Sequence, residues 1–391
     1  MERIIAYHQQ TKHQPNRMAR GPGRMDWSNQ PDPFRSYEGS KRLALDRLGF
    51  EGMTAKLRPS PLTSENLSRF FFESLALSGR KAVAGAEWTL RVNPSSGNLH
   101  PTECYLLAGG GEELDISPGV YHYQPKDHSL ELLACIREES WQSLHLPSST
   151  ILLILTTIYW RESWKYGARA FRYCMLDLGH ALATAGEAAR CLGWRLSLQE
   201  ELGTDDLARI LWNGPDKMAD GPTGKERPDV MLALFSDGRV HRMNERAKED
   251  LRGAMDPDFF WEKPSRTPPD LKLYRLAQGD ARPAAKESSC RQDIASDGCF
   301  AAAMISRFKG PIEQYGPWFY SRLFWECGMI GQAMYLSSEA TGFRGCGIGC
   351  FFDDMVHRML GLSDLRYQDL YHFTVGRALT DPRLIDLPAY G

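Results

Sequence analysis

The sequence lacks a strong excess of either charge and lacks any long hydrophobic run. Its 391 residues contain 47 Lys and Arg against 49 Asp and Glu, a formal net charge of −2 at pH 7. No overall field therefore favours nucleic acid or an anionic membrane as a partner. The most apolar run, residues 151–160, suits a buried strand and is too short to span a bilayer.

A disulfide framework and a secretory signal are also missing. The 9 cysteines are scattered, and an odd count without tight spacing favours reduced thiols in the cytosol. Residues 1–8 lack the apolar core of a signal peptide. Cys346 and Cys350 have no neighbouring ligands for zinc, so no metal is expected. We therefore expect a cytoplasmic globular protein whose core is large enough to fold without such staples.

An internal repeat is the main organising feature. At a constant offset of 149 positions Asp177 aligns with Glu326, and Gly193 aligns with Gly342. Further matches at this offset are Gly179 with Gly328, Trp194 with Phe343, Arg195 with Arg344, Asp205 with Asp354 and Leu211 with Leu360. Chance similarity between two amphipathic helices is the alternative. The paired acids, glycines and aromatic–Arg steps favour duplication.

Each copy predicts a long helix, a short helix and a strand. Apolar residues at helical spacing predict helices over residues 171–192 and 322–340, and each helix ends at a glycine. The closing strands are expected over residues 230–235 and 370–375. The first copy has more in front, namely a helix over 64–77, a strand over 103–108 and a hairpin of 120–123 with 130–133. The second copy lacks this front half, and a Pro-rich polar stretch precedes it instead.

Four segments carry groups that suit a ligand. The turn at residues 91–103 offers hydroxyl, amide and backbone groups, although a well-capped turn explains the same residues. Lys165 and Tyr166 stand before the first long helix, where a surface lysine and a core tyrosine are the alternative. The glycine-dense loop at 342–354 can turn backbone N–H groups toward a ligand, whereas the matching residues 195–200 contain no glycine. The fourth segment, residues 373–383, carries Arg377 and Arg383.

Together these segments resemble the nitroreductase superfamily, and most closely its proteins with two modules in tandem related to azoline dehydrogenases. The resemblance implies an α+β fold of two fused modules forming a pseudo-dimer. By resemblance, the turn and the glycine loop contact FMN, Lys165 and Tyr166 remove a proton beside the flavin, and the two arginines lie near its phosphate. The cofactor-binding residues so implied are Arg91, Pro94, Ser95, Ser96, Asn98, Gly347, Gly349, Cys350, Phe351, Arg377 and Arg383.

The expected organisation is a first module over residues 1–240, a linker or remnant over 241–290 and a truncated second module over 291–391. Since only one copy has the turn and only the other has the glycine loop, we expect at most one FMN per chain. The leading hypothesis is FMN-dependent oxidation or reduction of a small molecule or modified peptide. The segment missing from the second module belongs to the flavin site in the family, so the alternative is a flavin-free scaffold. A homodimer or a biosynthetic complex would suit either hypothesis.

Overall fold

The computed structural model describes residues 1–49, 59–111, 114–142, 146, 150–212, 220–221, 224–235, 263–265, 267–268 and 270–391. The chain folds into two compact units. The large unit comprises Arg20–Val240, Gly328–Ala333 and Leu379–Gly391, and the small unit comprises Met1–Ala19, His241–Cys327 and Met334–Ala378, each in its described residues. The predicted linker begins with residues 241–262, which lie outside the described residues.

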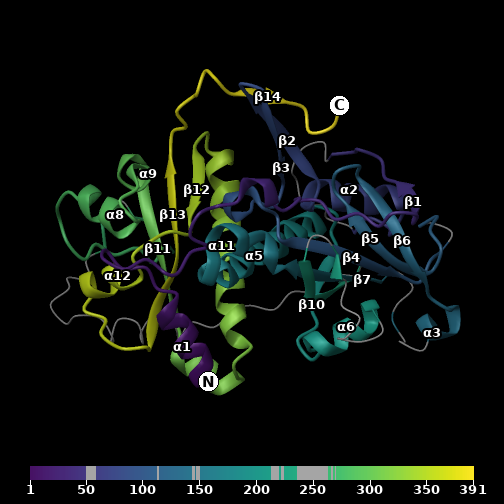
Figure 1. Ribbon diagram of the computed structural model, residues 1–391, viewed down its shortest axis with the longest axis horizontal. Coiled ribbons are helices and arrows are strands. Elements are labelled where there is room, and N and C mark those ends of the chain that lie inside the picture. The colour runs from purple at the N-terminus through teal and green to yellow at the C-terminus, as the bar shows by residue number, and fades with distance from the viewer. Residues whose placement is uncertain are drawn as a thin grey trace. The chain divides into compact units, whose positions relative to one another are not determined.

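An antiparallel sheet of eight strands forms the core of the large unit (Figure 1). Along the sheet the strands are β1 (Lys41–Ala44), β6 (Ser129–Cys135), β5 (Gly119–Gln124), β4 (Thr102–Ala108), β7 (Ile151–Ile158), β10 (Gly224–Phe235) and β8 (Arg195–Leu198), and β9 (Asp220–Gly221) pairs with β10. All eight residues of β7 are buried, as the apolar run predicted. This strand lies between β4 and β10, so both of its edges are paired.

Helices cover this sheet, and a second, smaller sheet borders it. The helices of the large unit are α2 (Ser64–Ser74), α3 (Glu138–Gln142), α4 (Tyr159–Tyr166), α5 (Ala170–Cys191) and α6 (Thr204–Trp212), with short 3-10 turns at Trp27–Asn29, Ser96–Asn98 and Gly167–Arg169. The small sheet has the order β14 (Ile385–Leu387), β2 (Leu77–Val83) and β3 (Ala86–Arg91). The C-terminal Tyr390 is fixed by accepting from Leu77 N at 3.0 Å and donating to Pro125 O at 2.8 Å.

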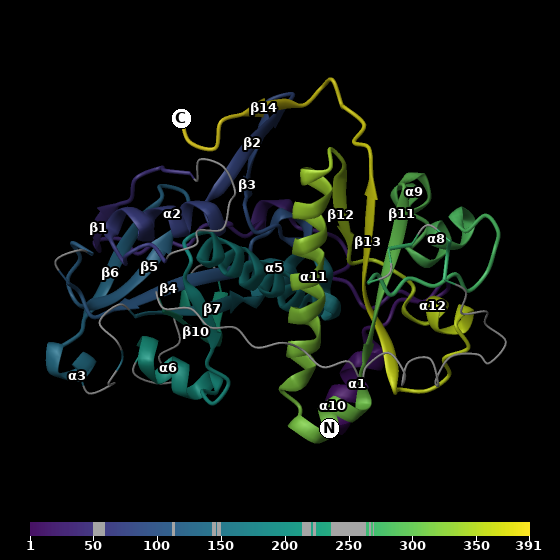
Figure 2. The ribbon, with the colours of Figure 1, turned by 180° about the vertical axis from the view of Figure 1, so that it is seen from behind.

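The small unit contains a three-stranded antiparallel sheet with helices around it (Figure 2). Its elements are α1 (Glu2–Gln10), α8 (Arg282–Ser288), α9 (Asp293–Asp297), β11 (Phe300–Arg307), α10 (Lys309–Tyr315), β12 (Arg344–Ile348), α12 (Asp353–Met359) and β13 (Tyr367–Gly376). Helix α11 (Phe319–Ala340) is shared, because its residues Gly328–Ala333 belong to the large unit. The strand order is β11-β13-β12. The N-terminal segment is held by polar contacts within this unit: Lys12 pairs with Asp354 at 2.6 Å, and buried His8 bonds Gln368 at 3.0 Å.

The two units repeat one order of elements at the offset seen in the sequence. Helices α5 and α11 both have 22 residues. Their first residues lie 149 positions apart, and so do their last residues. Strands β7 and β11 both have 8 residues at the same offset. Each opening strand pairs with its closing strand across one irregularity, between Pro228 and Val230 in one pair and between Met304 and Ile305 in the other. Residues 155 and 304 lie immediately beside these two bulges, again 149 apart.

Several sequence-based element boundaries need correction. The second long helix begins at Phe319 rather than at residue 322. The helix expected over 64–77 ends at Ser74, because Leu77 already pairs with Arg91 in β2. Residues 195–198 form strand β8 rather than a loop, since they pair with β10. The glycine-dense segment likewise begins as strand β12, which pairs with β13. The hairpin and the strand after the Ser-Ser-Gly-Asn turn are confirmed as β5–β6 and β4.

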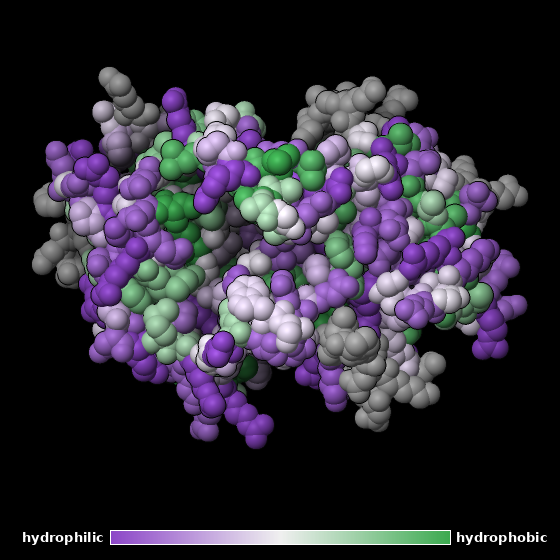
Figure 3. Space-filling model, turned by 45° about the horizontal axis from the view of Figure 1, so that its top comes forward, coloured by the Kyte–Doolittle hydropathy of each residue, from purple (hydrophilic) through white to green (hydrophobic). Residues whose placement is uncertain are grey.

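The surface shown in Figure 3 is mostly hydrophilic, with apolar side chains gathered in separate patches. Within the described parts of the chain, every helix is too short or too polar to cross a membrane.

Candidate functional site

The Pro94–His100 turn is held by its own side chains. Ser95 Oγ donates to Asp177 Oδ2 at 2.7 Å, and Ser96 donates to Asp177 Oδ1 from Oγ at 2.9 Å and from its backbone N at 3.0 Å. Asn98 Nδ2 donates to Thr89 O at 2.8 Å, while its Oδ1 lies 2.8 Å from His100 Nε2. The side chains expected to face a flavin are therefore bonded within the chain.

Positive φ angles explain why this turn contains glycine and asparagine. Gly97 has φ 62° and Asn98 has φ 60°, in the left-handed region that these two residues tolerate best. Gly97 is exposed, while its serine and asparagine neighbours are half-buried. The turn thus presents a bare stretch of backbone to solvent.

Lys165 and Tyr166, from the end of α4, lie against this bare backbone. A Cβ added at Gly97 would come within 2.6 Å of Tyr166 Oη and 2.8 Å of Lys165 Nζ. Both side chains are half-buried, and Lys165 Nζ lies 5.4 Å from the centre of the Tyr166 ring. The two predicted catalytic groups and the predicted turn are therefore brought together within the large unit. Any side chain at position 97 would displace them.

Two buried carboxyl groups, those of Asp177 and Glu162, accept hydrogen bonds from the turn. Burial raises the pKa of Asp177 to about 7, against the lowering effect of its bonds from Ser95 and Ser96. Burial and the Asp177 charge raise the pKa of Glu162 well above its ordinary value. A side-chain hydrogen bond between the two groups raises the pKa of Glu162 and lowers that of Asp177, which favours Glu162 as the protonated donor of that bond. The sequence indicated Asp177 through the repeat, but nothing in the sequence indicated Glu162.

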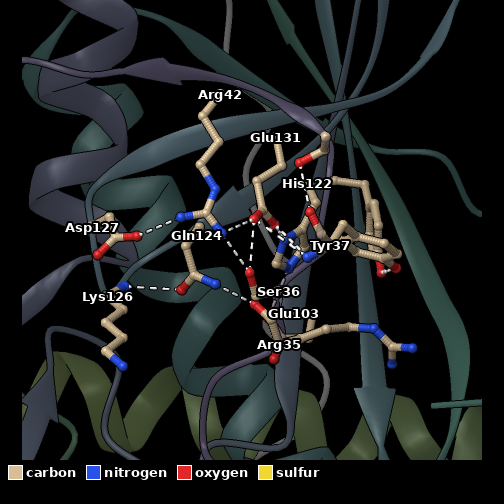
Figure 4. A network of polar contacts seen from close by, with 12 residues as sticks. Arg35, Ser36, Tyr37, Arg42, Glu103, His122, Gln124, Lys126, Asp127 and Glu131 are labelled. Carbon is tan, nitrogen blue, oxygen red and sulfur yellow. Dashed lines mark hydrogen bonds and ion pairs between the residues drawn. The ribbon is translucent and has the colours of Figure 1, made fainter.

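A second polar network lies inside the large sheet, where Figure 4 shows it around His122. His122 lies 2.9 Å from Glu131 Oε2 and 3.1 Å from Glu103 Oε2, and all three side chains are buried. Burial lowers the pKa of His122, but its bonds to the two carboxylates outweigh burial and raise it. Glu103 also receives Arg161 Nη1 at 2.5 Å, and despite burial these partners lower the pKa of Glu103 to about 2.

This network fastens three strands, and its central His122, Glu103 and Glu131 are buried. His122 on β5 stands directly opposite Glu131 on β6 and Tyr105 on β4. At the outer end Glu131 accepts from Arg42 Nη2 at 2.8 Å and from Ser36 Oγ at 3.0 Å. The sequence carries one signal for the network, namely charged residues at inward positions of apolar strands. Because His122 and both carboxylates are buried and bonded to one another, we interpret the network as structural.

In the small unit the glycine loop is also largely engaged. Gly347 N donates to Tyr335 Oη at 2.9 Å, and Cys350 O accepts from Gln292 Nε2 at 2.9 Å. Phe351 is buried, and its ring stacks on His372 with centroids 4.4 Å apart. A Cβ at Gly347 would overlap the Tyr371 hydroxyl, so any side chain there would displace Tyr371. Gly349 remains half-buried.

The remaining predicted residues are spread over the chain. Arg91 is buried and donates to Thr102 O at 3.4 Å and to Pro33 O at 2.5 Å. Arg377 is exposed at the end of β13, and exposed Arg383 pairs with Asp381 at 2.7 Å. Arg377 and the glycine loop belong to the small unit, whereas Arg383 and the turn belong to the large unit. That the turn lies near the glycine loop therefore stays a prediction.

The small unit also contains a Ser–His–Asp chain that the sequence did not suggest. Ser289 Oγ lies 2.9 Å from His372 Nδ1, and His372 Nε2 lies 2.7 Å from Asp369 Oδ2. The order resembles that of a hydrolytic triad. Ser289 is only 1% exposed, so a substrate carbonyl has no access to its hydroxyl. The chain of hydrogen bonds therefore fastens β13 to the residues after α8.

Among the described residues, no group of three or more His, Cys, Asp or Glu side chains is arranged to hold a metal ion.

Comparison with known proteins bears on the fold and the family. The Nitroreductase family pattern matches residues 236–377. The chain is 28% identical over 142 residues to a protein named as a nitroreductase in Methanocaldococcus jannaschii, a match covering 34% of this chain and 66% of that protein. It is 32% identical over 121 residues to the trifolitoxin-processing protein TfxB of Rhizobium leguminosarum bv. trifolii, covering 28% of this chain and 32% of TfxB. The chain thus spans less than two thirds of either relative.

A solved structure extends the likeness to almost the whole fold. The crystal structure of a protein named as a nitroreductase from Anabaena variabilis matches with a TM-score of 0.73 and 21% identity, covering 96% of this chain and 99% of that one. The chain therefore carries a Nitroreductase-family domain, and its α+β fold is nitroreductase-like.

Proposed function

We propose that this chain is an FMN-dependent oxidoreductase that dehydrogenates a small molecule or a modified peptide. The observation that carries the proposal is the convergence of Lys165 Nζ and Tyr166 Oη on the exposed Gly97 backbone. An amine and a phenol side by side suit the removal of a proton from a bound substrate. The similarity to a toxin-processing protein favours a precursor undergoing modification as the substrate.

Lys165 and Tyr166 divide the proton chemistry between them. Dehydrogenation removes a hydride and a proton, and a flavin would supply the acceptor for the hydride. Lys165 would take the proton at Nζ, and Tyr166 Oη would hold that amine in position over the turn. Both groups are half-buried, so they are shielded from bulk water while remaining within reach of a substrate.

The residues fit FMN through backbone and cationic groups better than through the turn's side chains. Ser95 and Ser96 donate to Asp177, and Asn98 is bonded to Thr89 and His100. We therefore propose the Gly97 backbone as the flavin contact from the large unit. Gly349 and Cys350 of the small unit are the matching backbone candidates, with Arg377 and Arg383 for the phosphate. We further propose that the two units arose by duplication. Because only one copy has the turn and only the other has the glycine loop, the chain would hold one such site.

The same hydrogen bonds support a second candidate. If the turn's side chains are permanently bonded within the chain, the protein is a flavin-free scaffold or partner subunit in a biosynthetic complex. The visible absorption spectrum of the purified chain separates the two candidates, because oxidised flavin absorbs there and the polypeptide does not. Flavin released by denaturation should not exceed one per chain. Two flavins per chain would contradict the single composite site, and none would favour the scaffold.

Substrate class can be tested on the flavin-loaded chain. A synthetic peptide carrying a thiazoline should lose two hydrogens, detected by mass spectrometry, and the same peptide carrying an acyclic cysteine should not react. Failure with the thiazoline but turnover of a small dehydrogenation substrate would retain the oxidoreductase and reject the azoline-dehydrogenase-like activity.

A further inference from the structure

Two cysteine side chains of the small unit, distant in sequence, meet sulfur to sulfur. Cys350 Sγ lies 2.7 Å from Cys290 Sγ, although 60 positions separate the residues. That separation is within an ångström of a covalent S–S bond, which is about 2.05 Å. Both residues are half-buried, so small reagents can reach them. We propose that Cys290 and Cys350 form a dithiol–disulfide site that reacts with small-molecule disulfides such as glutathione disulfide.

The backbone around both cysteines is fastened in register. Gln292 Nε2 donates to Ser289 O at 2.8 Å and to Cys350 O at 2.9 Å, so one side chain bridges the two segments. Phe352 N donates to Ser288 O at 2.7 Å, directly beyond the pair. The residue after Cys350, Phe351, is fixed by stacking on His372. The two thiols are therefore held together by their surroundings, so bond formation needs only a small displacement of the side chains.

The reaction has two steps that balance. One thiolate attacks the oxidant, so that a bond forms from protein sulfur to one sulfur of the oxidant while the S–S bond of the oxidant breaks and one small thiol leaves. The second protein thiolate then attacks the protein sulfur of this mixed disulfide, forming the Cys290–Cys350 bond and releasing the second small thiol. Two protein thiols lose two electrons to the oxidant, and their two protons end on the two released thiols.

The site does not depend on the proposed function, because thiol chemistry requires no flavin. It would act on the glycine loop, since Cys350 lies in that segment and a disulfide would tie the loop to the residues after α8. A cytosolic dithiol pair of this kind typically serves as a sensor or a catalyst rather than as a permanent staple.

The test uses the full chain treated with glutathione disulfide, alkylated, digested without reduction and mapped by mass spectrometry. A cross-linked peptide pair containing Cys290 and Cys350 is expected. The exposed Cys135 and Cys299 serve as internal controls and should carry glutathione instead. Glutathione retained on Cys290 and Cys350 at the level of these controls would overturn the proposal, and so would a cross-link to a different cysteine.

Single variants test the second step. In Cys290→Ser and in Cys350→Ser the remaining thiol should hold a mixed disulfide with glutathione that wild type resolves, because the attacking partner is gone. A matched Cys299→Ser variant should resolve like wild type. If a Ser variant does not fold, the rate at which glutathione disappears from wild type after the first step gives the same information. A stable mixed disulfide on wild type would reject the pair.

Discussion

The acids Asp177 and Glu326 occupy equivalent positions in α5 and α11 but have opposite surroundings. Asp177 is buried and accepts from Ser95 and Ser96, both supplied by the segment in front of the repeat. Glu326 is half-exposed and pairs with Arg322 one helical turn away at 3.2 Å. The helices, strands and bulges repeat between the units, but the contacts made by the paired acid differ. A repeated backbone therefore conserves geometry, while chemistry depends on which additional segment packs against each copy.

A similar contrast holds at the end of the short helix before each long one. Lys165 in the large unit is half-buried beside the turn, and the equivalent Gln314 in the small unit is exposed. The glycines that follow, Gly167 and Gly316, both have positive φ angles, of 55° and 94°. The backbone again repeats, and only one copy carries an ionisable group in a sheltered position.

The largest effect is expected from Lys165→Ala in flavin-loaded protein. The kcat for dehydrogenation should fall by roughly 10²–10⁴, the usual contribution of a general base, while flavin content stays unchanged. Gln314→Ala, the matched change in the other copy, should leave kcat as in wild type. A Lys165→Ala/Tyr166→Phe protein with wild-type turnover would show that these side chains are structural.

Replacing each of the two equivalent acids with alanine should lower the free energy of unfolding by different amounts. Asp177→Ala removes the buried carboxylate that accepts hydrogen bonds from the half-buried Ser95 and Ser96, so the free energy of unfolding should fall by about 2–4 kcal/mol. Glu326→Ala loses one surface pair within a helix, which contributes only about 0.3–0.5 kcal/mol. Urea denaturation of the two variants measures the difference. Equal losses of stability in the two variants would mean that the hydrogen bonds between the turn and Asp177 contribute nothing to stability.

Crossing of the long helices gives a third comparison. A Cβ at Gly328 would overlap the carbonyl oxygen of Leu176 and come within 2.9 Å of Gly179 Cα, both on α5. Gly328→Ala should therefore destabilise by about 1–3 kcal/mol, as overpacking does. Gly186→Ala, in the same helix pair, meets nothing within 4 Å and should stabilise by up to about 1 kcal/mol. Thermal unfolding of both variants should show melting shifts of opposite sign.

The smallest effect is expected from Glu162→Gln, and it appears in the pH dependence. A carboxyl whose pKa is raised by folding contributes stability that is present below its unfolded pKa, about 4, and is lost as pH rises through its folded pKa. For the Glu162–Asp177 pair this window extends from about pH 4 up to and beyond the Asp177 value of about 7. Glutamine mimics the protonated Glu162 and cannot lose the proton.

The Glu162→Gln protein should therefore gain stability relative to wild type as pH rises through that window. Asp177→Asn should not reproduce this gain, because the amide keeps only one of the two oxygens that accept from Ser95 and Ser96. Urea midpoints of the three proteins at several pH values test the comparison. A constant difference between Glu162→Gln and wild type would show that Glu162 does not titrate differently on folding.

Much of the fold follows from local patterns in the sequence. The period of apolar residues predicted α5 within a residue at each end, and the β5–β6 hairpin followed from two short apolar runs around a Pro-containing turn. Strand β8 was missed because residues 195–198 contain only four positions. Such a short strand exists through its pairing with β10, and that partner lies far along the chain. The motif residues Lys165 and Tyr166 were identified by resemblance, not by their spacing.

By itself, the sequence determined the repeat, the long helices and the position of the glycine required at residue 97. Only the tertiary structure decided which copy buries its acid, that Glu162 lies against Asp177, that His122 bridges two carboxylates, and that Cys290 meets Cys350. The physical reason is that helical period and turn chemistry act over a few residues, whereas burial, pKa shifts and thiol pairing depend on partners brought close by folding. Glu162 and Asp177 are separated by 15 positions and the two cysteines by 60, so no local pattern could join them.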